Sequence, residues 1–412
     1  MFGETPLTYV DTPEALARAA ESLAGAPVIG VDTEADSFHH YQEKVCLVQI
    51  SDLDNDYIID PLAVRDLSPL GPIFANPDQV KIFHGADYDV VSLKRDFGFT
   101  FRNLFDTMIA AQFAGLPRFG LADLIHRWFG HVIDKRYQRH DWAERPLRNE
   151  HLDYARGDTH FLPSLREILY RRLGQTDRLE PVLEECQILE GREWQGKAKD
   201  PADFLRVKGA RQLDAAAQRV LRATYAWRDR EARNLDRPAF KVIPDPVLLE
   251  LAVARPVGVE ALGRSLRPGS PLFRRFGVGL AAAITDGMAD TAPFADAAPR
   301  EQTERVDSAL SIRDQERLML RLKDWRNRVT SRDGESSVTV VSNAVLKDIA
   351  RAAPQTLEEL AAIPDVRRWQ VRMWGPQLVT QVTAELANLE PRPEDDGRPK
   401  KRRRRRPRPE AA

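Results

Sequence analysis

The chain has 412 residues, of which 42% are hydrophobic and 30% charged, and its formal net charge is −1. This composition is typical of a soluble globular protein and not of a disordered or membrane one, while the length predicts two to four domains. No apolar run approaches the roughly 20 residues that span a bilayer, and Cys46 and Cys186 are too few for a disulfide framework. We therefore expect a cytoplasmic protein without membrane attachment.

The first part of the chain combines one early helix with several short apolar runs. Thr12 and Pro13 precede the pattern ALARAAESLAG, which predicts an N-capped helix that ends near Gly25. Four apolar runs then predict strands, and the close spacing of the first three predicts antiparallel neighbours: VIGVD, KVCLVQIS, DYIIDP and KIFHGA. Because the pattern is mainly helical from there to residue 190, we expect a small mixed sheet with helices on its faces.

Three carboxylates, Asp32, Glu34 and Asp36, stand at alternate positions where the first strand ends. Side chains alternate across a strand, so Asp32 and Glu34 share a face. Two ionised carboxylates on one face repel each other, and a divalent cation such as Mg²⁺ or Mn²⁺ would relieve this repulsion through hard oxygen ligands. An acidic surface loop is the alternative interpretation of this segment.

Two further acidic clusters follow. In FHGADYDVVSL a strand gives way to a helix at Asp87 and Asp89, and helix capping would explain one of these two acids. In HLDYARGDTHFLPSL, Tyr154 and Asp158 are four residues apart and therefore neighbours on one face of a helix. A solvated Asp with a half-buried Tyr is the alternative there.

The chain repeats itself from about residue 205 onward. A shift of 98 residues aligns Trp227-Arg228 with Trp325-Arg326 and Pro256 with Pro354, without a gap. We therefore predict two helical modules, 205–290 and 305–388, with a linker at 291–304 between them.

A basic tail, predicted to be disordered, occupies 389–412. It holds nine cations within 398–408, which leaves −1 − 9 = −10 for the rest of the chain. Such a block attracts polyanions, although a solubility tail and a nuclear localisation signal have the same composition.

In combination, Asp-x-Glu, His-x4-Asp-x3-Leu and Tyr-x3-Asp resemble the three motifs of the DEDD exonuclease superfamily in its tyrosine form. FDTMIAAQFAG, LADLIHRWFG and DWAERPLRNEHLDYARGD are similar to bacterial ribonuclease D. LRATYAWRDREARNLDRPAFKVIPDPVLLELAVARP resembles an HRDC domain, and 305–388 resembles a diverged second copy. The resemblance implies an α/β ribonuclease H-like exonuclease domain over 1–195, followed by two all-α HRDC-type domains.

The same resemblance implies a 3′-5′ exoribonuclease that trims precursor tRNA and other small structured RNAs by two-metal-ion hydrolysis and releases nucleoside 5′-monophosphates. It implies that Asp32, Glu34 and Asp158 hold one Mg²⁺ or Mn²⁺ and that Asp89 helps to hold a second. Tyr154 would orient the attacking water, and Glu34 would also bond the terminal 3′-hydroxyl. We expect a monomer whose partner is a single-stranded 3′ end of RNA.

Further RNA contacts are expected from two places. Phe38, His39 and Tyr41 follow the first motif and would stack on the last bases, or else pack a loop. Arg228 and Lys241 lie on a basic segment of the first helical module and are candidates for RNA binding, although charge on a solvated helix face is common. In the second module RDGESSVT replaces NLDRPAFK, which leaves its contact with RNA open.

Asp36 has no counterpart in the motif, so we expect it to face solvent in the following loop.

Two other functions remain open at this point. A DNA exonuclease of the proofreading or Werner type would use the same four acids, because the choice between RNA and DNA depends on contacts with the 2′-hydroxyl. An inactive RNA-binding scaffold is the other alternative, and the presence of all four acids and the tyrosine opposes it.

Overall fold

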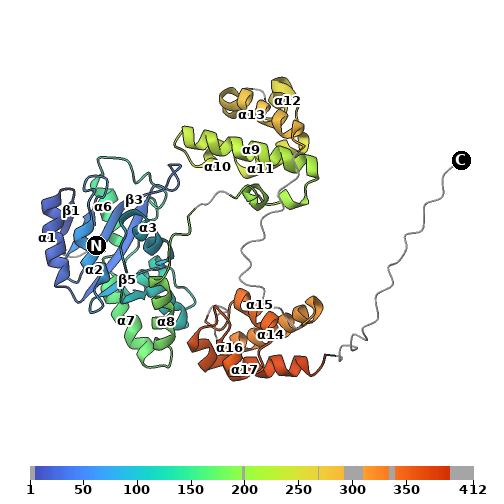
Figure 1. The fold of residues 1–412 in the computed structure, drawn as a ribbon. Helices are drawn as coiled ribbons and strands as arrows, with labels where there is room; N and C mark the ends of the chain where they lie inside the picture. The colour runs from blue at the N-terminus through green and yellow to red at the C-terminus, as the bar shows by residue number, and fades with distance from the viewer. Residues whose placement is uncertain (1–4, 197–199, 268, 292–309, 334–338, 390–412) are drawn as a thin grey trace. The chain divides into compact units, whose positions relative to one another are not determined.

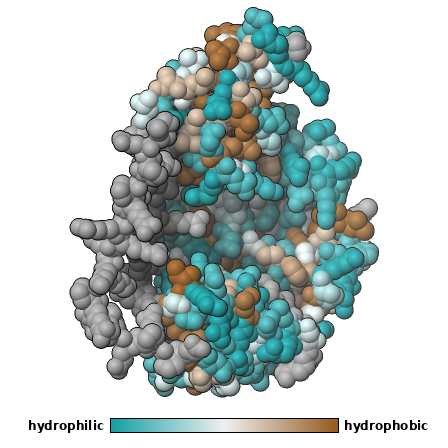
Figure 2. Space-filling model, turned by 90° about the vertical axis from the view of Figure 1, so that its right-hand side faces the viewer, coloured by the Kyte–Doolittle hydropathy of each residue, from teal (hydrophilic) through white to brown (hydrophobic). Residues whose placement is uncertain are grey.

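The computed structural model describes residues 5–196, 200–267, 269–291, 310–333 and 339–389 (Figure 1). The chain divides into two compact units, Met1–Arg305 and Val306–Ala412, which are described separately. On the face that Figure 2 shows, most of the coloured residues are hydrophilic, and hydrophobic patches lie between them. No helix within the described ranges combines the length and the hydropathy needed to cross a membrane.

The first unit begins with a six-stranded sheet in the order β1-β4-β3-β2-β5-β6. Its strands are β1 (Leu7–Val10), β2 (Val28–Ala35), β3 (Val45–Ser51), β4 (Asp56–Ile59), β5 (Val80–Phe83) and β6 (Leu104–Asp106). β2 pairs antiparallel with β3, and β3 with β4, as predicted, whereas the other three pairs are parallel. The sheet is therefore mixed. Sequence reasoning misses β1 and β6, which have 4 and 3 residues.

Helices flank this sheet. They are α1 (Pro13–Ala24), η1 (Ser68–Leu70), α2 (Gly71–Ala75), α3 (Asp87–Phe97), α4 (Thr107–Phe113), α5 (Leu121–Phe129), α6 (Asn149–Gly157), α7 (Leu162–Gly174) and α8 (Leu179–Glu190). α1 begins as predicted, because the Thr12 hydroxyl accepts the N–H of Ala15 and Pro13 takes the first helical position. α6 lies against β3 and β4, and α7 against β2 and β5.

The rest of the first unit is helical. It contains η2 (Asp203–Arg206), η3 (Ala210–Gln212), α9 (Ala215–Asn234), α10 (Ala239–Val242), α11 (Asp245–Ala254), α12 (Gly258–Ser265) and α13 (Pro271–Ala289). α9 packs against α10, α11 and α13. Trp227 of α9 is buried in this core and meets the ring of Phe276 edge-on, with centroids 5.9 Å apart.

The second unit contains α14 (Ile312–Asp333), α15 (Asn343–Ala352), α16 (Leu357–Ala361) and α17 (Arg368–Leu386). Trp325 and Trp374 meet edge-on at 6.2 Å. These two residues lie 98 positions after Trp227 and Phe276, so the same core contact recurs at the predicted offset.

The predicted linker 291–304 and tail 389–412 lie outside the described residues, apart from one residue of each at 291 and 389. The disorder predicted for the tail and the predicted domain boundaries therefore stay predictions.

Candidate active site

Strand β2 carries Asp32 and Glu34 on one face of the sheet. It pairs with β3 on one side, where Asp32 is opposite Gln49 and Glu34 opposite Leu47, and with β5 on the other. The register shifts between Glu34 and Ala35, which ends the regular pairing directly after the second acid.

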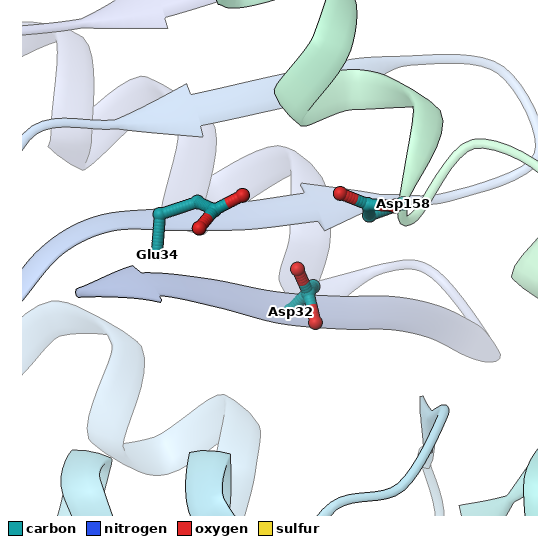
Figure 3. Close-up of side chains that lie close together, drawn as sticks. All are labelled: Asp32, Glu34 and Asp158. Carbon is teal, nitrogen blue, oxygen red and sulfur yellow. The ribbon is translucent and has the colours of Figure 1, made fainter. Parts of the chain in front are cut away.

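Asp158 joins these two acids from a distant part of the chain, directly after α6. One carboxylate oxygen from each of Asp32, Glu34 and Asp158 lies within 4.8 Å of the others. Figure 3 shows the three side chains converging on a common space. The first and third acidic clusters of the sequence thus meet in one site.

Asp89 lies beside this group, in the first turn of α3, and is 7% exposed. Its Oδ1 accepts a hydrogen bond from the hydroxyl of Thr33, the residue between the two acids of β2. Asp89 is not one of the three residues whose ligand atoms lie within 4.8 Å of one another. Its part in holding a metal therefore stays a prediction.

The four carboxyl groups oppose one another's ionisation. Burial, and then the charge of Asp89, raises the pKa of Asp158 to about 7. Burial raises the pKa of Asp89 to about 6, although the hydrogen bond from Thr33 lowers it. Burial and then the neighbouring carboxylates raise the pKa of Asp32 and Glu34 well above the usual range.

This donor set fits a divalent cation. Among the described residues, no cationic side chain is a main cause of the pKa shifts of Asp32, Glu34 or Asp158. Clustered carboxylates without a cation are costly when ionised, and hard cations take oxygen ligands of this kind.

A buried ion pair holds the segment that carries Asp158. Asp56 of β4 is 1% exposed and accepts hydrogen bonds from Nε of Arg156 at 2.8 Å and from Nδ1 of His160 at 3.0 Å. These two partners lie two residues before and two residues after Asp158. The hydroxyls of Ser51 and Thr159 also bond at 2.7 Å, so β3 and β4 together fix this turn.

Gly30 of β2 lets the same turn approach the sheet. A Cβ at this position would lie 2.8 Å from the carbonyl oxygen of Thr159 and 2.9 Å from Cβ of Leu162. Only glycine leaves room for this contact, which brings the start of α7 against β2 and Asp158 toward Asp32.

Tyr154 is part of an aromatic cluster with Trp142 and Tyr137. Its ring lies 5.7 Å from that of the buried Trp142 and 5.9 Å from that of Tyr137. Burial, and then the charges of Asp158 and Glu34, raises the pKa of its phenol above the ordinary value. The hydroxyl therefore keeps its proton at neutral pH.

The loop after β2 corrects one prediction. Asp36 is fully buried, not solvent-facing, and its Oδ1 accepts the N–H of Lys44 at 2.9 Å. Its carbonyl accepts the N–H groups of His39 and His40, so Asp36 closes the loop 36–44 upon itself. The prediction rested on the absence of Asp36 from the motif, which carries no information about the hydrogen bonds that bury this side chain.

The three predicted stacking residues of this loop differ in their surroundings. Phe38 is 47% exposed, and the guanidinium of Arg139 lies 5.8 Å from its ring centroid. His39 bonds the carbonyl of Arg139. Tyr41 instead contacts the first helical module, because its hydroxyl donates to Asp229 at 2.7 Å and its ring packs on that core.

The two basic residues predicted to contact RNA, Lys241 and Arg228, differ in their exposure. Lys241 is exposed on α10. Arg228 is only 5% exposed and donates to the carbonyl of Ile243 at 2.9 Å and to Asp245 at 2.6 Å. The charge of Arg228 is therefore used inside the module, and its contact with RNA stays a prediction.

Sequence reasoning misses Thr33, Asp56, Arg156 and His160. The sequence shows that Arg156 and His160 flank Asp158 in the third motif. It contains no local pattern that indicates their shared partner, Asp56 on β4. Asp56 was visible only as the first residue of a predicted strand.

Comparison with family models places known domains on this architecture. A 3′-5′ exonuclease family matches residues 7–174, and the HRDC domain matches residues 217–284 and again 315–382. The two HRDC matches are 315 − 217 = 98 residues apart, which is the offset of the repeat.

Curated relatives agree with these models. The ribonuclease D of Acidiphilium cryptum is 31% identical over 369 residues, covering 89% of this chain and 90% of that protein. An exosome complex component 10 homolog of Caenorhabditis elegans is 36% identical over 269 residues, which are 64% of this chain. The chain spans 31% of the length of that exosome relative.

Among solved structures, the chain is similar to an Escherichia coli RNase D described as an exoribonuclease involved in structured RNA processing. The TM-score is 0.67 at 25% sequence identity, and the match covers 92% of this chain and 99% of that one.

Proposed function

Because this chain belongs to the ribonuclease D family, we propose that it is a 3′-5′ exoribonuclease that removes nucleotides singly from RNA and releases nucleoside 5′-monophosphates. The observation that carries this function is the meeting of Asp32, Glu34 and Asp158 within 4.8 Å, with Asp89 bonded to the same strand. Its substrates are the single-stranded 3′ ends of tRNA precursors and other small structured RNAs, on which it acts as a cytoplasmic monomer.

Asp32, Glu34 and Asp158 hold one divalent cation, Mg²⁺ or Mn²⁺, and Asp89 takes part in holding a second. When bound, such a pair of ions lowers the pKa of water and neutralises negative charge on the phosphate that is attacked. The raised pKa values of the four acids support this assignment, because carboxylates that repel one another gain most from a cation.

Tyr154 positions the attacking water. Its phenol keeps its proton, so it donates a hydrogen bond and does not act as the base. Trp142 and Tyr137 hold its ring, which limits the directions in which the hydroxyl can point. Glu34 accepts a hydrogen bond from the terminal 3′-hydroxyl, and this contact restricts cleavage to chain ends.

The test uses 5′-labelled RNA with a free or a blocked 3′ end, with Mg²⁺, with Mn²⁺ or with a chelator. A ladder shortened from the 3′ end, present only with metal and a free end, is the expected result. Asp158→Asn should abolish the ladder and keep RNA binding. Internal cleavage, or shortening of the blocked RNA, would contradict the proposal, and faster degradation of a matched DNA would overturn the choice of substrate.

A further inference from the structure

Gln49 of β3 is a buried polar residue beside the acids of β2. It is the direct cross-strand partner of Asp32. Residues opposite each other in an antiparallel pair point to the same face of the sheet, with Cβ atoms about 5 Å apart. Every residue of β3 is buried, and Gln49 itself is 0% exposed. The strand therefore carries a side-chain amide into the interior, next to a residue of the acidic cluster.

The amide of Gln49 makes no hydrogen bond within the described part of the chain. Both its Oε1 and its Nε2 are buried and have no partner there. A buried donor and acceptor without partners lower stability, and an apolar side chain of similar size would avoid this cost. A partner that arrives with a ligand explains the amide better than packing does.

Two other buried glutamines show how this chain uses such an amide to support the fold. Nε2 of Gln79 donates to the carbonyls of Leu23 at 2.7 Å and Ala26 at 2.6 Å. Gln370 donates to a backbone carbonyl at 3.1 Å and accepts a backbone N–H at 3.0 Å. Within the described ranges Gln49 forms neither kind of bond, so its amide does not hold the backbone.

The groups around Gln49 point to one acceptor for this amide. On the other side of β3 its cross-strand partner is Ile58 of β4, which packs against Ala155 of α6 in an apolar cluster. Ser51, two residues along β3 on the same face, already uses its hydroxyl in the bond to the turn after α6. Asp32, across the pair of β2 and β3, is the neighbour that offers a carboxylate.

We propose that Gln49 is a positioning residue of the metal site, and that its Nε2 donates a hydrogen bond to the carboxylate of Asp32. Each carboxylate oxygen has two lone pairs, so a cation and a donor can share the group. Carboxylates that bind metals are held in orientation by such donors. The bond keeps Asp32 turned toward Glu34 and Asp158, whose ligand oxygens lie within 4.8 Å of its own. This role rests on the proposed metal-dependent function and adds to it a residue that binds neither metal nor RNA.

The test compares two variants of the full chain, Gln49→Met and Gln79→Met, each of which replaces a buried amide by an apolar side chain of similar size. Mn²⁺ binding is measured without RNA, from the electron paramagnetic resonance of the free ion, and stability by denaturation in a chelator. Gln49→Met should raise the Kd for Mn²⁺ about tenfold or more. It should unfold at the same or a higher denaturant concentration, because an unpaired buried amide is removed. Gln79→Met should unfold at a lower concentration, because two hydrogen bonds are lost, and should bind Mn²⁺ as the unmodified chain does.

The Mg²⁺ concentration for half-maximal RNA degradation should rise by the same factor in Gln49→Met, and should not rise in Gln79→Met. An unchanged Kd for Mn²⁺ in Gln49→Met would overturn the positioning role, and so would a loss of stability in the chelator as large as that of Gln79→Met. An unmodified chain that binds Mn²⁺ but does not shorten RNA from the 3′ end would contradict the exoribonuclease function, and the Kd values would still decide the role of Gln49. An unmodified chain that binds no Mn²⁺ would overturn both.

Discussion

Oδ2 of Asp56 accepts a hydrogen bond from Nε of Arg156 at 2.8 Å, and both side chains are buried. The bond joins strand β4 to a residue that lies between Tyr154 and Asp158 in the third motif. The positions of Tyr154 and Asp158 should therefore depend on a carboxylate that is not among the proposed metal ligands.

Asp56→Asn should lower kcat about tenfold, because the turn that carries Asp158 loses the partner of a buried guanidinium and shifts. The free energy of unfolding should fall by about 3 kcal/mol for the same reason. Steady-state kinetics and chemical denaturation measure the two effects, and Asp54→Asn, at an exposed residue of the preceding turn, is the control of equal charge. A variant with lower stability and normal kcat would show that Asp56 supports the fold alone.

Gly30→Ala should move the turn that carries Asp158 away from Asp32 and Glu34 on β2. The added Cβ would lie 2.8 Å from the carbonyl oxygen of Thr159, which is backbone and cannot rotate away. We expect a loss of stability of about 2 kcal/mol and a lower kcat, because the start of α7 must move away from β2. Gly25→Ala is the control, since its Cβ would lie 3.6 Å from the carbonyl oxygen of Ser22, an ordinary van der Waals distance. Activity equal to that of this control would refute the close-contact argument.

The metal-free protein should lose stability as the pH rises. The folded-state pKa values of Asp89, about 6, and Asp158, about 7, exceed the value of about 4 expected in the unfolded chain. The folded state therefore binds more protons, and this contribution is complete below pH of about 4 and is lost as the pH rises through about 7.

Thermal melting in a chelator over this range measures the effect. Mg²⁺ should raise Tm more at pH of about 8 than at pH of about 5, because it binds the ionised acids. Asp158→Asn removes one titrating group, so the Tm of the metal-free variant should depend less on pH. If the metal-free, unmodified protein gained stability relative to Asp158→Asn between pH of about 5 and about 8, the raised pKa values would be contradicted.

The resemblance to three exonuclease motifs, each with a local spacing, grouped the four acids and Tyr154 into one predicted site, of which the structure brings Asp32, Glu34 and Asp158 together. Asp32 and Glu34 are alternate residues of one strand, and Tyr154 and Asp158 lie one helical turn apart. The partners that hold them could not be located, since Asp56 and Arg156 are 100 residues apart and no periodic pattern joins them. Asp36 was placed wrongly because its absence from the motif was taken to mean exposure, whereas hydrogen bonds within the loop bury it.

The burial of Arg228 was not predicted, for a different reason. The sequence of an arginine-rich helix predicts that its charged side chains face solvent. Only the three-dimensional structure shows that Arg228 donates to the carbonyl of Ile243. Its retention as Arg326 was visible in the repeat, but a repeat alone does not distinguish a core contact from a shared binding function.

Arg228→Met should therefore destabilise the first HRDC domain and leave the salt dependence of RNA binding unchanged. The loss should be about 2 kcal/mol, because the carbonyl of Ile243 and the carboxylate of Asp245 lose a charged donor. Calorimetric melting measures the first effect, and RNA affinity at several salt concentrations measures the second. Arg326→Met is the matched variant, and it should destabilise the second domain to a similar extent since Arg326 makes equivalent bonds. A smaller salt slope for Arg228→Met at full stability would identify Arg228 as an RNA contact.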